Sequence, residues 1–392
     1  MHANTNPFNP GAGNPPFALV GRDDELAACT AAVERLSLGR GARGIVAYGL
    51  RGTGKTVLLG QFTSIAAAHG WMALRVESDP SASSPFIERL ADRLSIQLRA
   101  LVTPTMSERA RAALGAFKSF RVAVGLDEVS FGVEIAPRYA RPYTGKVTLD
   151  LPDLLVTIAQ VQVERRAGIM VAVDEMQDLT GEELNALLRA VQDANLENLP
   201  LLVCGAGLPS LPRILGTARS YAERMFDYRN LGPLDAAATR RALVEPVTSL
   251  GEAWSHDALD VLEPVTAGYP YFIQVFGKAA WDVAAFSPID AADAKVATSI
   301  GFEELDQGFF LARWDRATTA EQRYLTVMAA DGDGPSLARD VAKRLGRKQE
   351  ALSAIRGRLV GKGIIFSPKR GQIAFTVPGM ATFIRRAAEL DR

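Results

Sequence analysis

Apolar runs alternate with helical patterns over the first 231 residues of the chain. A strand that is apolar almost throughout is typical of a parallel sheet covered by helices on both faces. The predicted strands are GIVAY at 44–48, WMALRVES at 71–78, GIMVAVD at 168–174, LPLLVCGAG at 199–207 and FDYRNL at 226–231. The predicted helices lie near 21–36, 57–70, 85–101, 107–117, 151–165 and 213–225. This alternation predicts an α/β core with a parallel sheet.

One segment departs from the alternation of strands and helices. At 119–135, SFRVAVGLDEVSFGVEI, apolar and polar residues alternate on either side of GLDE. A period of two predicts strands, so we expect a β-hairpin inserted in the core at this point. Such an insertion is a candidate surface for a protein partner.

Two further domains are predicted after the α/β core, which we place at 20–231. The pattern is helical over 232–317, which predicts a helical lid. In 318–392 three helical patterns precede a hairpin, GIIFSPKRGQIAFTV at 363–377, and this order predicts a winged helix-turn-helix. Residues 1–19 are rich in Pro, Gly and Asn, which favours a leader without regular structure. We expect Phe8, Phe17 and Leu19 to anchor that leader.

The stretch GLRGTGKT at 49–56 lies between the first predicted strand and a predicted helix. Its spacing, G-x-x-x-x-G-K-[ST], is that of a phosphate-binding loop. Glycines allow backbone N–H groups to curve around phosphate oxygens, Lys55 adds a cation, and the Thr56 hydroxyl is a ligand for Mg²⁺. The predicted nucleotide-binding residues are Gly49, Gly52, Thr53, Gly54, Lys55, Thr56 and Val57.

Two acids, Asp174 and Glu175, end the predicted strand at 168–174. Ligand groups belong at the carboxyl ends of parallel strands, so both acids should lie beside the phosphate loop. Asp174 is then suited to the Mg²⁺ shell and Glu175 to polarising the attacking water. The pair therefore favours ATP hydrolysis, with Lys55 and Glu175 as catalytic residues, over nucleotide binding alone.

Composition restricts the setting of this chemistry. The chain has 392 residues, of which 48% are apolar and 22% charged, as in ordinary soluble proteins. It has no run of 18 apolar residues and no secretion signal at its start, so we expect a cytoplasmic protein without membrane contact. Cys29 and Cys204 match no metal or redox spacing.

Charge is distributed unevenly along the chain. The formal net charge is zero, yet 318–392 carries fourteen Lys or Arg and seven Asp or Glu, which gives +7 there and −7 elsewhere. A basic region of this kind indicates a polyanionic partner, here duplex DNA. In the third helical pattern of this region, Leu352, Ile355 and Leu359 form the apolar stripe. The predicted DNA contacts are Arg356, Arg358 and Lys362 on that helix, and Lys369 and Arg370 at the hairpin tip.

These motifs together resemble a known family. VGRDDEL, GLRGTGKT, VAVDEMQDL, GAGLPSL, GYPYFIQ and the winged pattern are similar to those of compact bacterial and archaeal P-loop ATPases of the AAA+/STAND group. The origin-recognition ATPases have the same predicted architecture of α/β core, helical lid and winged helix. The resemblance extends over nearly the whole chain from Val20. It implies ATP or ADP with Mg²⁺ as cofactors, ATP hydrolysis and a P-loop NTPase fold.

The resemblance also implies further site residues. It brings Val20, Gly21 and Arg22 close to the adenine, and Pro270, in the lid motif GYPYF, against the nucleotide. It implies an arginine finger, which acts on a neighbouring subunit's nucleotide after self-association in the ATP state. Arg224 is the first candidate for the finger and Arg219 the second.

The chain departs from the family pattern in three places. The strand at 199–207 ends without an Asn or Thr to sense the γ-phosphate, and the lid offers no second sensing arginine. The hairpin expected at 119–135 has no counterpart in the family. These departures favour a slow switch over a fast motor.

Two functions remain open. The first is an ATP-dependent switch that binds DNA, and the second is a STAND-type signalling or defence regulator in which the winged helix contacts proteins. A small-molecule kinase or GTPase would leave the basic tail without a role, and no N-K-x-D stretch for guanine is present.

Overall fold

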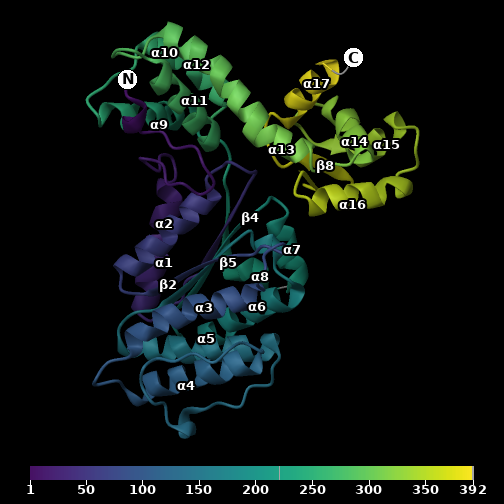
Figure 1. Cartoon of the computed structure of the whole chain (residues 1–392). Helices are drawn as coiled ribbons and strands as arrows, with labels where there is room; N and C mark the ends of the chain where they lie inside the picture. The colour runs from purple at the N-terminus through teal and green to yellow at the C-terminus, as the bar shows by residue number, and fades with distance from the viewer. Residues whose placement is uncertain (220, 391–392) are drawn as a thin grey trace.

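The computed structural model describes residues 1–219 and 221–390, and it contains a parallel sheet with helices on both faces (Figure 1). The sheet has five strands in the order β2-β3-β4-β1-β5. Their bounds are β1 Gly44–Tyr48, β2 Met72–Glu77, β3 Ile169–Asp174, β4 Leu201–Gly207 and β5 Phe226–Asn230. All four pairings are parallel. The predicted strands and the α/β fold class are thereby confirmed.

Neighbouring residues of the three central strands, β3, β4 and β1, belong to two different hydrophobic clusters. In β3, Val171 and Val173 pack with one cluster, whereas Met170 and Ala172 pack with the other. Helices α1 (Asp23–Ser37) and α2 (Lys55–Ala68) cover the second face. The first face is covered by α3 Phe86–Leu98, α4 Glu108–Ala123, α5 Val147–Glu164 and α6 Gly181–Leu196. Burial on both faces explains why the strands are apolar almost throughout.

The prediction of a β-hairpin at 119–135 is wrong. Helix α4 continues to Ala123, and the residues from 124 to 146 contain one short 3₁₀ turn, Pro137–Tyr139, and no strand. Phe117 and Phe120, three residues apart, are both buried, which is the spacing of one helix face. Tertiary burial of that face overrides the period-two pattern, since Val122 stays largely exposed. The hairpin surface predicted for a protein partner therefore does not exist.

The predicted helix at 213–225 is two helices, α7 (Leu211–Ala218) and α8 (Ala222–Met225), and Ser220 lies outside the described residues. No helix in the described residues is both long and apolar enough to cross a membrane.

Helices alone follow β5 for the next eighty residues, as the pattern predicts. We call α9 (Ala236–Thr248), α10 (His256–Thr266), α11 (Pro270–Val283) and α12 (Ala291–Glu304) the lid. The leader folds onto it: the Phe8 side chain is buried against Gly277 of α11. Phe17 is exposed, so it does not anchor the leader as predicted. A π-helical segment, η5 (Leu305–Leu311), and α13 (Ala312–Trp314) continue from α12.

The remaining elements, which we call the tail, lie beside the lid in Figure 1. They are α14 Thr319–Ala329, β6 Ser336–Leu337, α15 Ala338–Arg344, α16 Ser353–Gly361, β7 Ile365–Phe366, β8 Gln372–Phe375 and α17 Met380–Leu390. The strands form an antiparallel sheet in the order β6-β8-β7. The predicted helices and hairpin are present, whereas β6 and α17 were not predicted.

Lid and tail share one apolar cluster, in which Phe310 of η5 stacks on Phe383 of α17 with ring centroids 5.4 Å apart. The predicted domain boundaries at 231 and 317 fall between elements of this continuous chain and stay predictions.

A buried carboxylate organises the tail. Glu321 of α14 is fully buried and accepts hydrogen bonds from Lys362 Nζ at 2.6 Å and Arg358 Nε at 2.9 Å. Burial alone would raise the pKa of Glu321, but the hydrogen bonds from Lys362, Thr318 and Arg358 outweigh it and lower the pKa to about 2. The carboxylate therefore stabilises the fold when it is ionised.

We predict that Glu321→Gln lowers the free energy of unfolding at pH 7 by about 2 kcal/mol, the scale of a charged hydrogen bond. The ordinary pKa is 4.5 and the folded-state pKa is about 2, so the stabilisation is complete above pH 4.5 and is lost between 4.5 and 2. Urea unfolding at pH 7 and pH 3 should show a smaller difference between variant and wild type at pH 3. Glu350→Gln, which changes an exposed acid of the tail, is the control; equal stabilities of all three proteins at pH 7 would contradict this role.

Candidate nucleotide-binding site

The phosphate loop connects the carboxyl end of β1 to the first turn of α2. Gly52 and Gly54 have φ angles of 83° and 86°, in the left-handed region that favours glycine. No side chain caps α2, whose first residue is Lys55. The N–H groups of this first turn are therefore free to bind an anion, and the helix dipole favours negative charge there.

The Lys55 ammonium group is buried within the loop. Its Nζ donates hydrogen bonds to the carbonyl oxygens of Gly49 at 3.0 Å and Leu50 at 2.7 Å. Burial, assisted by repulsion from Arg51, lowers the pKa of Lys55 to about 8, against the attraction of Glu175 and Asp174. A phosphate group would compensate this desolvated cation.

Asp174, the last residue of β3, lies within reach of Thr56. Asp174 is 5% exposed, and burial raises its pKa, while the hydrogen bond from Thr56 opposes that rise. Arg75 Nη2 of β2 lies 3.6 Å from Asp174 Oδ2. A carboxylate and a hydroxyl in this position are oxygen donors of the kind that Mg²⁺ prefers.

Glu175 adopts the left-handed conformation, with φ 47° and ψ 44°. Such backbone conformations cost energy in a non-glycine residue and cluster at functional sites. The Glu175 carboxylate accepts hydrogen bonds from Arg51 Nη1 at 3.2 Å and Gln177 Nε2 at 2.8 Å. Gln177 in turn accepts from the Leu208 N–H at 3.0 Å, which ties this carboxylate to the end of β4.

A cavity of about 980 Å³ joins the loop to the lid and the leader. Its size is that of small-molecule sites. The predicted residues that line it are Val20, Arg22, Gly52, Thr53, Gly54, Lys55, Thr56, Val57, Asp174, Glu175 and Pro270. Core, leader and lid thus bring almost the whole predicted nucleotide set to one cavity.

Two predicted residues, Gly21 and Gly49, do not line the cavity. Gly49 supplies a carbonyl to Lys55, and Gly21 packs beside Ala238 of α9. Arg22, although it reaches the cavity, is buried and donates to the carbonyls of Thr53 at 3.3 Å and Gly232 at 2.8 Å. It therefore ties the phosphate loop to the entrance of the lid.

Several cavity residues were not predicted from the sequence. Arg51 occupies a variable position of the loop motif, Arg75 lies in β2, and Tyr271 is the second residue of α11. Phe309 and Arg313 come from η5 and α13, far along the chain. Arg51 alone carried a signal, as the only cation besides Lys55 in the loop, whereas the others reach the cavity through tertiary folding.

The arginine-finger candidates lie away from this cavity. Arg224 of α8 lines a small surface hollow with Arg43 and Gln192, and Arg219 Nε donates to Asn185 Oδ1 at 2.7 Å. Neither residue contacts the chain's own phosphate loop.

The predicted DNA contacts divide into two groups. Arg358 and Lys362 both bind Glu321, and Arg356 is half-buried, so the expectation that all three face solvent is only partly met. Lys369 and Arg370 are exposed in the turn between β7 and β8 and form no ion pair with the described residues. Two exposed cations before α16, Arg347 and Lys348, were not singled out from the sequence.

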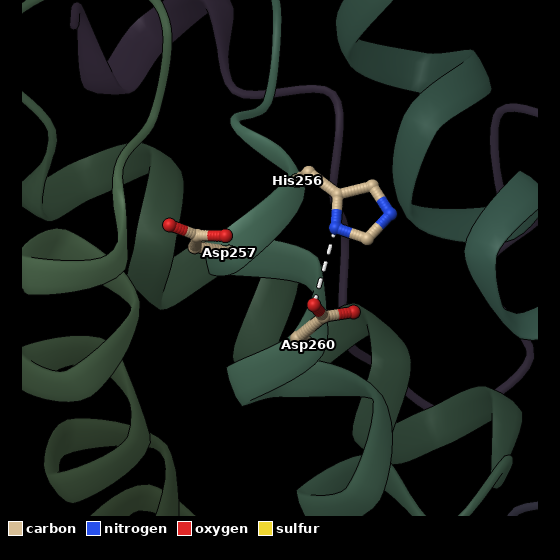
Figure 2. Close-up of side chains that lie close together, drawn as sticks. All are labelled: His256, Asp257 and Asp260. Carbon is tan, nitrogen blue, oxygen red and sulfur yellow. Dashed lines mark ion pairs between the residues drawn. The ribbon is translucent and has the colours of Figure 1, made fainter.

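A polar cluster on α10 is separate from the cavity. His256, Asp257 and Asp260 are exposed, and His256 Nδ1 lies 3.1 Å from Asp260 Oδ2 (Figure 2). Asp260 also accepts a hydrogen bond from Arg240, whose Nε bonds Glu263. Arg240 balances these acids, and we assign the cluster to a surface polar network.

Comparison with known families agrees with this geometry. Residues 18–204 match the AAA ATPase domain family, and residues 307–384 match a domain of unknown function (DUF8462). Among curated proteins none matches the sequence. The fold is similar to that of a Walker-type ATPase of Pyrococcus abyssi, with 16% identity, a TM-score of 0.57, and 94% of this chain and 96% of that one covered.

Two other solved structures have lower scores. The RuvB Holliday junction branch migration motor of Thermotoga maritima has 14% identity, a TM-score of 0.42, and coverage of 93% and 96%. Aeropyrum pernix Orc1 in complex with DNA has 16% identity, a TM-score of 0.43, and coverage of 96% and 95%.

Residues 18–204 therefore match the AAA ATPase domain family, and the phosphate loop and its neighbouring acids lie within this segment. That family implies a nucleotide as ligand. At 16% identity the Pyrococcus ATPase shows the shared fold alone.

We predict that the affinity for MgATP declines with rising pH above about 8, because Lys55 must be protonated to bind phosphate. The decline should approach tenfold per pH unit. Calorimetric titration between pH 7 and 9.5 measures it. Lys55→Arg, which stays charged over this range, should bind with an affinity that does not depend on pH. A wild-type affinity that is constant to pH 9.5 would contradict a role for the Lys55 charge.

Proposed function

We propose that this protein is an ATP-binding, slowly ATP-hydrolysing switch whose tail binds DNA in a nucleotide-dependent way. One contact carries the proposal: the N–H of Arg51, inside the phosphate loop, donates a hydrogen bond to the Thr376 carbonyl of the tail at 2.9 Å. Nucleotide at the loop and the position of the tail are thereby linked through a single residue.

The chemistry follows from the groups around the cavity. The loop N–H groups and Lys55 would hold the phosphates, while Thr56 and Asp174 would hold Mg²⁺, which neutralises charge on the phosphate oxygens. Glu175 would orient and polarise the attacking water. In the present arrangement Arg51 pairs with Glu175, so release of this pair is a condition for turnover.

Arg51 also connects this chemistry to the tail. A side chain at Gly363, the residue before the tail hairpin, would meet the Arg51 guanidinium, because a Cβ there lies 2.9 Å from Nη2. The same arginine thus contacts the Glu175 carboxylate and the tail at two points. A terminal phosphate that attracts Arg51 would disturb both contacts, and this supports coupling of ATP to tail position.

Exposed cations support DNA as the partner of the tail. Lys369 and Arg370 at the hairpin tip and Arg347 and Lys348 before α16 lie on the elements that a winged helix-turn-helix uses. Backbone contacts by such residues bind any duplex sequence.

A second candidate function, a signalling regulator whose tail contacts proteins, is favoured by a different observation. Arg358 and Lys362, on the helix that would enter the groove, are engaged with Glu321 inside the tail. These two cations stabilise the fold and are less available to DNA.

Self-association in the ATP state also belongs to the proposal. Arg224 lies on α8, away from its own cavity, which suits a finger that acts on a neighbouring subunit's nucleotide.

We predict that Lys55→Ala loses ATP binding and that Glu175→Gln keeps it while turnover drops at least about 100-fold, the contribution of a general base. Phosphate release under saturating MgATP measures turnover, and calorimetry measures binding. Glu182→Gln, an exposed acid at the start of α6, is the matched control and should behave as wild type. Parental turnover in Glu175→Gln would refute the catalytic assignment.

We predict that replacing Lys369 and Arg370 by Ala weakens duplex binding equally across sequences and lowers the log–log salt slope by roughly 1–2. Titration of labelled duplex at several salt concentrations, with MgADP and with MgATPγS, measures both effects. We expect wild-type affinity to differ between the two nucleotides.

Lys295→Ala, an exposed lysine of the lid, is the control for that titration. Absence of binding at low salt in both nucleotide states would reject DNA and leave the protein-partner function.

A further inference from the structure

One cavity-lining cation has no anionic partner among the described residues. Arg313 lies in α13, directly after η5, and lines the cavity between phosphate loop and lid. Its guanidinium lies 4.3 Å from the centroid of the Phe309 ring and donates to the Phe309 carbonyl. Among the side chains that the structure describes, those of residues 1–219 and 221–387, no carboxylate lies within ion-pair distance of it. A cation so placed lacks the compensation that buried charges ordinarily have.

Neighbouring positive charges further destabilise the charged form of Arg313. Burial lowers the pKa of Arg313 to about 10, and repulsion from Arg51 and Arg316 contributes. The side chain is still protonated at pH 7. Two acids of the cavity lie next to other arginines, Glu175 next to Arg51 and Asp174 next to Arg75. The third, Glu77, forms no ion pair with Arg313. An anion that entered the cavity would therefore find Arg313 free.

The platform under Arg313 rests on the phosphate loop. Phe309 stacks on Tyr271, with ring centroids 4.7 Å apart. The Tyr271 N–H donates to the Gly52 carbonyl at 3.1 Å, and a Cβ at Gly52 would lie 3.9 Å from Phe309 Cζ. The aromatic pair thus holds Arg313 beside the loop segment that precedes Lys55, where the outer phosphates of a nucleotide bind.

We propose that Arg313 binds the terminal phosphate of a nucleoside triphosphate and thereby distinguishes triphosphate from diphosphate. This inference rests on the proposed function of the cavity. Arg313 belongs to the segment 307–384 that matches the domain of unknown function, and lies outside the AAA ATPase segment. Through Arg313, the segment 307–384 would thus contribute a residue to the nucleotide site.

The position of Arg313 in the chain gives this contact a consequence. Helix α13 joins the lid, through η5, to α14, the first helix of the tail. A phosphate that binds Arg313 would shift α13 and would thereby change the position of the tail. The route is separate from the Arg51–Thr376 contact, which lies in the loop itself.

The test compares affinities for MgATPγS and MgADP by calorimetry in wild type and Arg313→Gln. We expect Arg313→Gln to weaken MgATPγS about 10- to 100-fold, as expected for loss of a charged hydrogen bond, and MgADP less than about threefold. Arg313→Lys should fall between the two, because a lysine keeps the charge but not the planar fork. Arg316→Gln, which changes an exposed neighbouring arginine outside the cavity, should leave both affinities unchanged.

Folding is checked by thermal unfolding without nucleotide, where loss of an uncompensated cation should not lower the midpoint. If Arg313→Gln disturbs folding, the same titrations are done with Arg313→Met, which keeps the apolar packing on Phe309. Equal weakening of both nucleotides, or none, would overturn the role of Arg313 alone. Failure of wild type to bind either nucleotide would overturn the proposed function as well.

Discussion

Concentrated positive charge around the phosphate loop is the constraint on which the cavity depends. Burial lowers the pKa of both Lys55 and Arg313, and repulsion from Arg51 lowers both further. Glu175 and Asp174 offset part of this charge, because they attract Lys55 and lie next to Arg51 and Arg75. The site is thus suited to a polyanion, because the negative charge of the phosphates lowers the electrostatic energy of these cations. The groups that hydrogen-bond to the phosphate loop are therefore affected when phosphates bind.

Three parts of the chain contact the loop through its backbone. Arg22, beside the leader, donates to Thr53. The lid donates from Tyr271 to Gly52, and the tail accepts at Thr376 from Arg51. Because the loop is short and its glycines have fixed left-handed conformations, these bonds leave it little freedom. A ligand that shifts the loop must alter at least one of them.

Much of the fold was predictable because the signals were local. The strands of the core are apolar on both faces, and the loop motif follows β1 without a gap. At 119–135 the local signal failed, since Phe120 fits the strand pattern but is buried together with Phe117 on one face of a helix. Only packing against the rest of the core decides between the two. In the tail, the two-residue strand β6 is too short to give a pattern at all.

The amino-acid sequence was sufficient to locate the phosphate loop, the acids Asp174 and Glu175 and the basic character of the tail, because each depends on residue type and spacing along one short segment. Tertiary packing, in contrast, pairs Arg358 and Lys362 with the buried Glu321. It also brings Arg313, Tyr271 and Thr376 to a loop more than two hundred residues earlier. Such contacts arise because lid and tail bury a common apolar cluster. The periodicity of a sequence identifies the apolar face of each element but not the element against which that face packs.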